Sequence, residues 1–226
     1  MALDTYTKLL LHMDGVDQAT TFIDSEPTPK TVTTIGSGKI VTAQSKFGGA
    51  SGSFTNLGSD GVTLADHADW DFPGDFTIDF WAMRTATTYF GLIYANSNIN
   101  ATTPGLIIGP GSVNFTYQHT IGNVGWVLYY APAITFPASE WHHFAVVRTG
   151  TTVKLFMDGT QVGTDQTDAV AITSTTVLSI PYRSKPWGFE GFIDEFRVSK
   201  GIARWTANFT PPTSAYGSYT PQIQIF

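Results

Sequence analysis

The residues with the clearest chemical potential are the acids within residues 191–198, which read Gly-Phe-Ile-Asp-Glu-Phe-Arg-Val. Strand alternation places Asp194 on an apolar face of this segment. The other side chains of that face are Phe192, Phe196 and Val198. A carboxylate on an apolar face is costly unless it is paired or bound to a cation. Asp194 therefore predicts either a cation site or a buried partner.

A structural calcium ion is one solution for Asp194, because calcium binds six to eight oxygens, often from carboxylates and loop carbonyls. A buried ion pair is the alternative, and its candidate partners are Arg84, Arg148 and Arg197. Hydrogen bonds from backbone amides to the carboxylate are a further alternative. The residues alone leave these possibilities open.

The adjacent residues His142 and His143 have the type of a zinc pair but not its geometry. Neighbouring strand residues point to opposite faces, so the two rings cannot bind one metal. We expect packed or hydrogen-bonded histidines there. The other histidines, His12, His67 and His119, are isolated in the sequence.

Aromatic side chains are the expected contacts for a glycan, because sugars present apolar C–H faces that stack on rings. Two groups of residues fit this role: Trp126, Tyr129 and Tyr130, and a loop that contains Tyr182, Arg183 and Trp187. The basic charge beside Trp187 would suit an acidic sugar or a polar protein partner. The same rings could instead pack in the core or anchor a protein interface.

The elements that must position these residues are strands. Short runs rich in Val, Ile, Phe, Thr and Tyr alternate with Gly, Pro, Asn and Asp clusters, and helical periodicity is nearly absent. This pattern predicts an all-β protein, built as a two-sheet antiparallel β-sandwich. The expected strands are residues 8–13, 32–34, 62–64, 76–84, 90–94, 106–108, 113–118, 126–130, 141–149, 153–157, 160–163, 177–180 and 192–199.

Two of these segments are expected to be central. Residues 76–84 and 141–148 carry apolar side chains on both faces, so both faces should be covered. Asp158-Gly159, directly after the expected strand at residues 153–157, is typical of a tight hairpin turn.

The composition excludes several classes. The net charge is −6 and the twelve basic residues are scattered, which argues against a phosphate-tracking, nucleic-acid-binding surface. There is no cysteine, so neither a disulfide nor a thiolate metal site can form, and a bacterial or viral origin is favoured. Leu9-Leu10-Leu11 is too short for a signal peptide or a membrane span. Release inside an assembled virus particle would be one route out of a cell.

Six segments, in order along residues 8–216, resemble the concanavalin A-like lectin/glucanase superfamily in its laminin-G-like branch. Together they imply a jelly roll of the concanavalin A type used for recognition. They are residues 9–15 (Leu-Leu-Leu-His-Met-Asp-Gly), 46–51 (Lys-Phe-Gly-Gly-Ala-Ser), 75–81 (Asp-Phe-Thr-Ile-Asp-Phe-Trp), 141–144 (Trp-His-His-Phe), 156–159 (Phe-Met-Asp-Gly) and 191–197.

The resemblance implies a calcium site. In this family an acid after the first strand and the acid of the closing strand commonly bind structural calcium, and here these are Asp14 and Asp194. A carbonyl of Gly48 or Gly49 could contribute to it.

Because the superfamily includes glucanases, the spacing of the acids indicates whether catalysis is to be expected. The related glucanases carry two glutamates around an aspartate, as E-x-D-x-x-E or E-x-D-x-E, and retention needs carboxyl groups about 5 Å apart. Glu190, Asp194 and Glu195 read E-x-x-x-D-E, which is out of register. We therefore expect no enzymatic activity.

The segments at residues 199–205 and 209–212 resemble sequences that are often found in bacteriophage particle proteins. The leading hypothesis is a non-enzymatic virion protein, either a capsid decoration or tail-associated. It would be made in the host cytoplasm without a signal peptide. Its expected partners are capsid or tail proteins and cell-surface or environmental glycans, but neither nucleic acid nor membrane. The alternatives are a carbohydrate-binding module of a bacterial adhesin or secreted enzyme, working at the bacterial surface or outside it, and a glycoside hydrolase, which the missing glutamates disfavour.

The expected domains are the sandwich, residues 1–212, and a C-terminal arm, residues 213–226. Pro211-Pro212 ends regular structure, and the arm has an apolar end, Ile223-Gln224-Ile225-Phe226. Such an arm could add a strand to a neighbour and form a homo-oligomer. The alternative is a last strand packed on its own domain.

Overall fold

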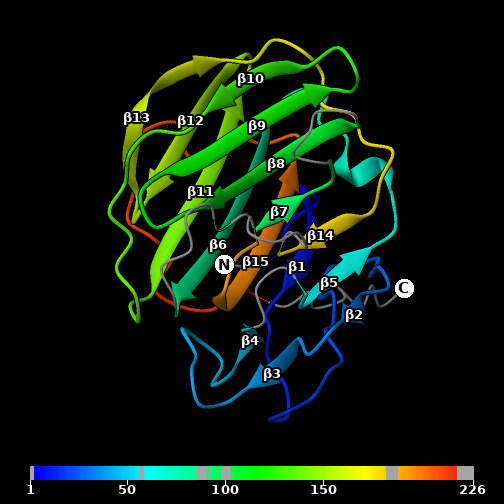
Figure 1. Cartoon of the computed structure of the whole chain (residues 1–226), viewed down its shortest axis with the longest axis vertical. Coiled ribbons are helices and arrows are strands. Elements are labelled where there is room, and N and C mark those ends of the chain that lie inside the picture. The colour runs from blue at the N-terminus through cyan, green and yellow to red at the C-terminus, as the bar shows by residue number, and fades with distance from the viewer. Residues whose placement is uncertain are drawn as a thin grey trace, which may run out of the picture.

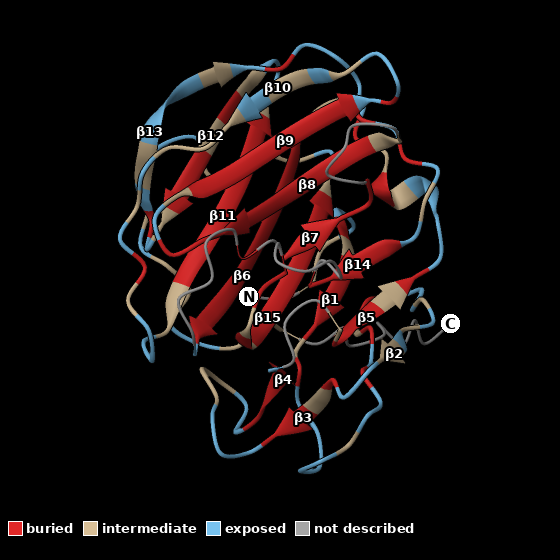
Figure 2. Cartoon of the chain, in the orientation of Figure 1, coloured by how far each residue is buried: buried red, intermediate tan, exposed pale blue. Residues whose placement is uncertain are grey.

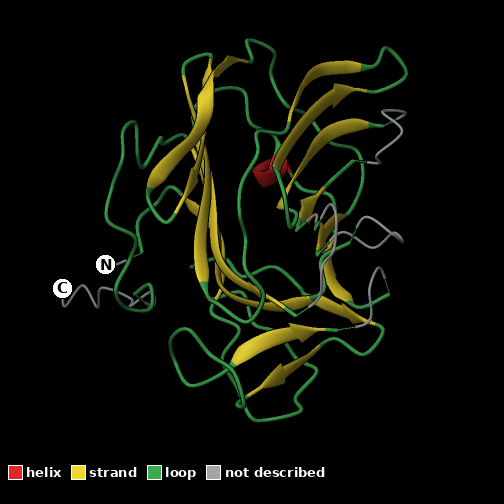
Figure 3. Ribbon diagram, turned by 60° about the vertical axis from the view of Figure 1, so that its left-hand side comes forward, coloured by secondary structure: helices red, strands yellow, loops and turns green. Residues whose placement is uncertain are grey.

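Two antiparallel sheets stacked face to face form the chain, as the computed structural model shows for residues 3–55, 59–85, 91, 93–97, 103–181 and 188–217 (Figure 1; Figure 3). One short 3-10 helix, η1 (Ala68–Trp70), is the helical part of these described residues. The predicted all-β sandwich is confirmed. In the part of the chain that the structure describes, no helix has the length and apolar character needed to cross a membrane.

The larger sheet has eight strands in the order β13-β12-β11-β6-β15-β4-β3, and β1 pairs with β15 outside that path. Its central strand β6 pairs antiparallel with β11 on one side and β15 on the other. The strands are β1 (Thr7–Leu11), β3 (Lys39–Val41), β4 (Ser51–Phe54), β6 (Phe76–Arg84), β11 (His142–Thr149), β12 (Thr152–Met157), β13 (Thr160–Thr167) and β15 (Gly191–Lys200).

The smaller sheet has seven strands in the order β10-β9-β8-β7-β14-β5-β2. Its edge strand β10 pairs only with β9 among the described strands, so one side of β10 faces away from the sheet. The strands are β2 (Thr33–Ile35), β5 (Gly61–Leu64), β7 (Tyr94–Ala95), β8 (Pro104–Pro110), β9 (Phe115–Ile121), β10 (Trp126–Tyr130) and β14 (Leu178–Ile180).

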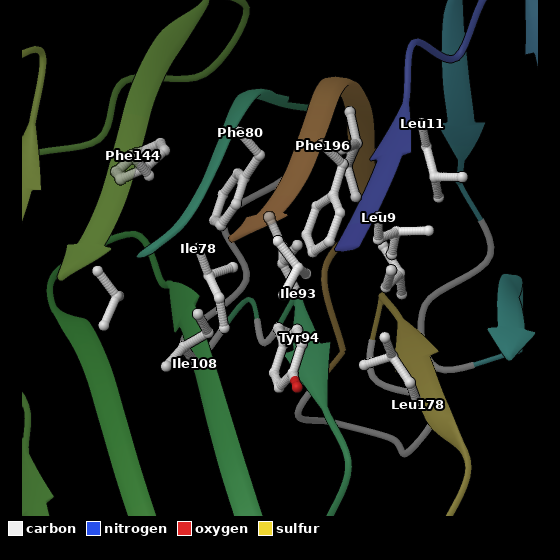
Figure 4. Close-up of a cluster of buried hydrophobic side chains, with 14 of the residues drawn as sticks. Leu9, Leu11, Ile78, Phe80, Ile93, Tyr94, Ile108, Phe144, Leu178 and Phe196 are labelled. Carbon is white, nitrogen blue, oxygen red and sulfur yellow. The ribbon is translucent and has the colours of Figure 1, made fainter. Parts of the chain in front are cut away.

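The core lies between the two sheets and is rich in aromatic rings. Phe80 of β6 stacks on Phe144 of β11 and on Phe196 of β15, with ring centroids 5.8 and 5.6 Å apart. Residues of the smaller sheet, including Ile108 and Leu178, pack against this layer (Figure 4). Alternate residues of the two central strands enter this core, namely Phe76, Ile78, Phe80 and Ala82 of β6 and Phe144 and Val146 of β11.

The outer face of the larger sheet is also covered, but by a loop rather than by a sheet. All nine residues of β6 are buried (Figure 2). On the outer face, Ala145, Val147 and Phe156 pack against Ala203, Trp205 and Phe209. The segment that follows β15, residues 201–217, therefore runs across the outside of the sheet and is called the cover below (Figure 3). Its presence explains why both faces of the central strands are apolar.

The predicted Asp158-Gly159 turn between β12 and β13 helps to hold this cover in place. Gly159 has φ +75°, a conformation that favours glycine. Its carbonyl accepts a hydrogen bond of 2.9 Å from the Phe209 amide. A Cβ at Gly159 would lie 1.8 Å from the Phe209 carbonyl oxygen, so only glycine permits this approach.

A polar network fixes the end of the cover. Asp79 of β6 accepts hydrogen bonds from Arg197 Nε and Nη2 at 3.0 and 3.1 Å. The Tyr216 hydroxyl donates to the same carboxylate, and the Arg197 guanidinium lies 3.7 Å from the Tyr216 ring centroid. Burial alone would raise the pKa of Asp79, but the charge of Arg197 lowers it to about 2. Asp79 therefore stays ionised and paired at neutral pH.

A β-bulge in β15 overturns the face predicted for Asp194. The register with β6 shifts between Asp194, which pairs with Trp81, and Arg197, which pairs with Asp79. Glu195 in the bulge has φ +50°. Phe196 and Val198 consequently enter the core, whereas Asp194 points to the outer face with Trp81, because directly paired residues share a face. The alternation failed because a bulge adds one residue on one strand.

Two strands were missed in the sequence, and the end of the chain is only partly described. β4 was not predicted because Ser51-Gly52-Ser53 has low strand propensity and forms a strand through its pairing with β15. β3 was not predicted because it is only three residues long, and it pairs with β4. Of the predicted arm, residues 213–217 are described, and Tyr216 is only 7% exposed. Residues 218–226 lie outside the described residues, so the arm stays a prediction.

Replacing Asp79 with alanine tests the network. Asp79→Ala leaves the buried Arg197 without a counter-ion, so we expect a loss of about 3–5 kcal/mol in the free energy of unfolding, measured by urea denaturation. The matched control is Asp165→Ala, which removes an exposed partner of Lys154 and should cost at most about 1 kcal/mol. Equal effects of the two substitutions would contradict this account.

Candidate functional site

The Asp194 carboxylate belongs to a set of acids beside β15, called the acidic cluster below, since the charges of Glu195 and Asp14 both act on it. Its Oδ2 accepts hydrogen bonds from the amides of Lys46 and Phe47 at 2.7 and 3.0 Å. Its Oδ1 is buried and has no hydrogen-bond partner. Burial, together with the charges of Glu195 and Asp14, raises the pKa of Asp194 to about 7, against the lowering effect of the two amides.

The ion pair considered for Asp194 does not form, whereas the backbone hydrogen bonds do. Arg197 binds Asp79 instead. Arg148 donates to the carbonyl oxygens of Phe72, Gly74 and Val170. Arg84 donates to the Phe136 carbonyl. The Asp194 carboxylate therefore accepts hydrogen bonds from backbone amides, and the bonds that the three arginines make go elsewhere.

Asp14 lies against the same turn, as the sequence predicted. Its carboxyl group packs on Gly48, where an added Cβ would lie 2.1 Å from Oδ1 and 2.3 Å from Oδ2. Gly48 has φ +64°, so both its conformation and this contact require glycine. Burial and the charge of Glu195 raise the pKa of Asp14. The turn at residues 46–48 thus brings Asp14 and Asp194 to one place.

Two further residues join this set: His12, which the sequence left isolated, and Glu195, which it considered only as a catalytic acid. His12 Nδ1 lies 2.8 Å from Glu195 Oε1, and one ligand atom each of His12, Asp14 and Glu195 lie within 4.8 Å of one another. Burial alone would lower the pKa of His12, but the hydrogen bond to Glu195 and the surrounding acids raise it. His12 is therefore not isolated. Its closeness to Asp14 in the sequence was the available signal, but Met13 between them has φ +60°, so strand alternation does not account for their proximity.

The histidine pair behaves as predicted. His142 Nδ1 lies 2.6 Å from Asp158 Oδ2, and its ring packs on Phe136. His143 lies on the outer face, where its ring packs on Trp81 and Trp205. The rings point to opposite sides of β11 and do not share a site.

Two exposed aromatic residues lie elsewhere, on β10. Trp126 is 44% exposed and Tyr129 is 50% exposed, and their rings form an edge contact with centroids 5.8 Å apart. Simple alternation would put them on opposite faces. A register shift between Trp126 and Leu128 brings both onto the outer face of the smaller sheet, opposite Thr120 and Gln118 of β9.

Tyr130 is not part of this exposed pair. It packs against the core, and its hydroxyl accepts a hydrogen bond of 2.7 Å from the Thr164 amide at the edge of β13. The other three predicted contacts, Tyr182, Arg183 and Trp187, lie outside the described residues.

The sequence matches the profile of a known protein family. The sequence profile described as the concanavalin A-like lectin/glucanases superfamily matches residues 56–204. No curated protein matches the sequence.

Several solved structures share the fold. Domain 4 of AbnA, a GH43 extracellular arabinanase from Geobacillus stearothermophilus, in complex with arabinotriose, is similar with a TM-score of 0.64 and 17% identity, over 87% of this chain and 93% of that one. A structure of botulinum neurotoxin type C, whose cell entry depends on interaction with two ganglioside molecules, is similar with a TM-score of 0.62 and 12% identity, over 86% of this chain. The binding domain of botulinum neurotoxin DC in complex with SialylT is similar with a TM-score of 0.61 and 13% identity, over 87% of this chain.

These likenesses show the fold alone, because the identities are low. This chain spans about half of the two neurotoxin chains, 47% and 48% of their lengths.

Proposed function

This chain belongs to the concanavalin A-like lectin/glucanases superfamily, and from that premise we propose that it is a carbohydrate-binding module without catalytic activity. The observation that carries the proposal is the exposed pair Trp126 and Tyr129 on the edge strand β10. Two adjoining rings on a hydrogen-bonded strand form a rigid apolar ledge, and such a ledge suits the C–H faces of a sugar.

The residues paired with these two rings lie beneath them. Gln118 and Thr120 of β9 are directly opposite Tyr129 and Trp126 in the register, on the same face. Gln118 is only 5% exposed and Thr120 is fully buried, with its hydroxyl donating to the Thr103 carbonyl, so the two exposed rings are the part of this face that a sugar can reach. The similar structures with arabinotriose and SialylT are consistent with a glycan as ligand.

The described carboxylates support a role without catalysis. Glu195 Oε1 contacts His12, and Glu195 Oε2 accepts a hydrogen bond of 2.8 Å from the Tyr216 amide. Asp194 is fully buried. Neither carboxyl group is free to protonate or attack a glycosidic bond, which a hydrolase would require of its paired acids.

We further propose that the acidic cluster binds structural calcium through Asp14 and Asp194. The unpartnered, buried Oδ1 of Asp194 fits this ion, because calcium prefers carboxylate oxygens. Asp14 and Glu195 add negative charge nearby. A bound calcium would keep the Asp194 carboxylate ionised and would hold the turn at residues 46–48 against β15.

Finally, we propose that the module is displayed on a bacteriophage particle, bound to capsid or tail proteins. The support is the resemblance of residues 199–205 and 209–212 to endings found in such proteins. In the structure this ending covers the larger sheet, which leaves the Trp126 ledge, on the other sheet, accessible to a glycan.

The glycan prediction is tested with a glycan array and titration calorimetry. We expect the wild-type chain to bind at least one glycan. Trp126→Ala and Tyr129→Ala should each weaken this binding at least tenfold, about 1.4 kcal/mol, because each removes a stacking surface. Val177→Ala, at another exposed apolar residue, is the matched control and should bind normally. A blank array would point to a protein interface at the ledge instead.

The calcium prediction combines metal and pH. Without metal, the folded state keeps a proton on Asp194 up to about pH 7, whereas the unfolded state loses it near pH 3.8. The contribution of Asp194 to stability therefore falls as the pH rises from about 4 to 7. In chelator, wild-type melting temperature should fall across this range more than that of Asp194→Asn.

Calcium should reverse this loss in the wild-type protein. At 100-fold above the dissociation constant we expect about 2.7 kcal/mol, or about 5–10 °C in melting temperature. Asp14→Asn and Asp194→Asn should abolish the gain, and Asp165→Asn should keep it. No calcium response in the wild type would refute the site.

The virion prediction is tested by mass spectrometry of purified particles. The chain should be present at a fixed ratio to the major capsid protein and should remain after a high-salt wash. Recovery only from the particle-free supernatant would favour a free carbohydrate-binding module.

A further inference from the structure

A cavity of about 490 Å³ lies on the outer face of the larger sheet, beneath residues 210–216. It is lined by Arg197 at the end of β15, by Ala203, Arg204 and Trp205, and by the segment that leads to Tyr216. Its volume falls in the range of about 300–1,000 Å³ that small-ligand sites occupy. It is far from the ledge in the fold, because Trp126 and Tyr129 belong to the other sheet.

Arg197 gives this cavity an unused hydrogen-bond donor. Its Nε and Nη2 donate to Asp79, but Nη1 has no hydrogen-bond partner among the described residues. The side chain is only 5% exposed, but Nη1 is not among the fully buried atoms without a partner. Nη1 therefore keeps contact with solvent, and Arg197 lines the cavity, so this group can donate to a ligand oxygen there.

The charges of the cavity are already balanced. Asp79 neutralises Arg197, and Arg204 donates from Nη1 and Nη2 to the two carboxylate oxygens of Asp4, both at 3.0 Å. An anion would have to compete with these carboxylates, whereas a neutral acceptor would not. The cavity therefore favours a neutral ligand over an acidic one.

The remaining walls are apolar or carry hydroxyl groups. Trp205, Tyr216 and the Pro211-Pro212 pair provide rings, and Thr213 and Ser214 are exposed at the rim. One face of Trp205 is occupied by Phe209, whose ring centroid lies 4.0 Å away. A compact ligand with an apolar face and several hydroxyl groups matches such walls.

We propose that this cavity is a second carbohydrate site, which accepts a single neutral sugar ring. Arg197 Nη1 donates to a ring hydroxyl, and the apolar face of the sugar packs against the Trp205 side of the cavity. This site is separate from the Trp126 ledge, so either site can fail without the other.

The test is NMR titration of the full chain with four neutral probes, the methyl glycosides of glucose, galactose, mannose and arabinofuranose, and with sodium glucuronate as the acidic counterpart of glucose. The Trp205 indole N–H signal is assigned by its loss in Trp205→Phe. At least one neutral glycoside should shift this signal, and glucuronate should bind more weakly than methyl glucoside.

Variants at the cavity and at the ledge separate the two sites. Ser214→Trp at the rim and Ala203→Leu within the cavity should weaken the response at least tenfold, whereas Ser214→Ala should not; melting temperatures confirm that each variant folds. Trp126→Ala should leave the Trp205 response unchanged. The proposal is overturned if no neutral glycoside shifts the signal, if the response survives Ser214→Trp, if it disappears in Trp126→Ala, or if glucuronate binds more tightly.

Discussion

The β-bulge at Glu195 is the constraint on which the rest of this structure depends. One extra residue in β15, with φ +50° at Glu195, lets Phe196 enter the core while Asp194 stays on the outer face. The same bulge turns Glu195 toward His12 and the Tyr216 amide. Without the bulge, Asp194 and Phe196 would lie on the same face of the sheet. Asp194 would then enter the core with Phe196, or Phe196 would leave the core with Asp194.

The segment after β15 makes the larger sheet a two-sided core. Trp205 and Phe209 cover the apolar outer face, and Tyr216 is tied to Asp79, Arg197 and Glu195. The acidic cluster and the end of the cover therefore share Glu195. A cation at Asp194 would act on a neighbour of the residue that holds Tyr216, so calcium binding and packing of the cover should respond together.

A second bulge, in β10, has the corresponding effect on the other sheet. It places Trp126 beside Tyr129 on one exposed face, while Tyr130 returns to the core and caps the Thr164 amide at the edge of β13. Edge strands are natural sites for such irregularities, since only one side must keep its ladder. The fold thus presents an aromatic ledge without sacrificing core packing.

The sequence by itself determined the all-β class, the faces of β6 and β11, the Asp158-Gly159 turn and the separation of His142 from His143, because these follow from local alternation and turn chemistry. It also indicated Asp14 and Asp194, which the structure brings to the same turn. Only the tertiary structure decided which way Asp194 points, that His12 and Glu195 join it, and that Trp126 and Tyr129 lie together. Each of these depends on a bulge, and a bulge arises from pairing between strands that are distant in sequence, so local periodicity does not reveal it.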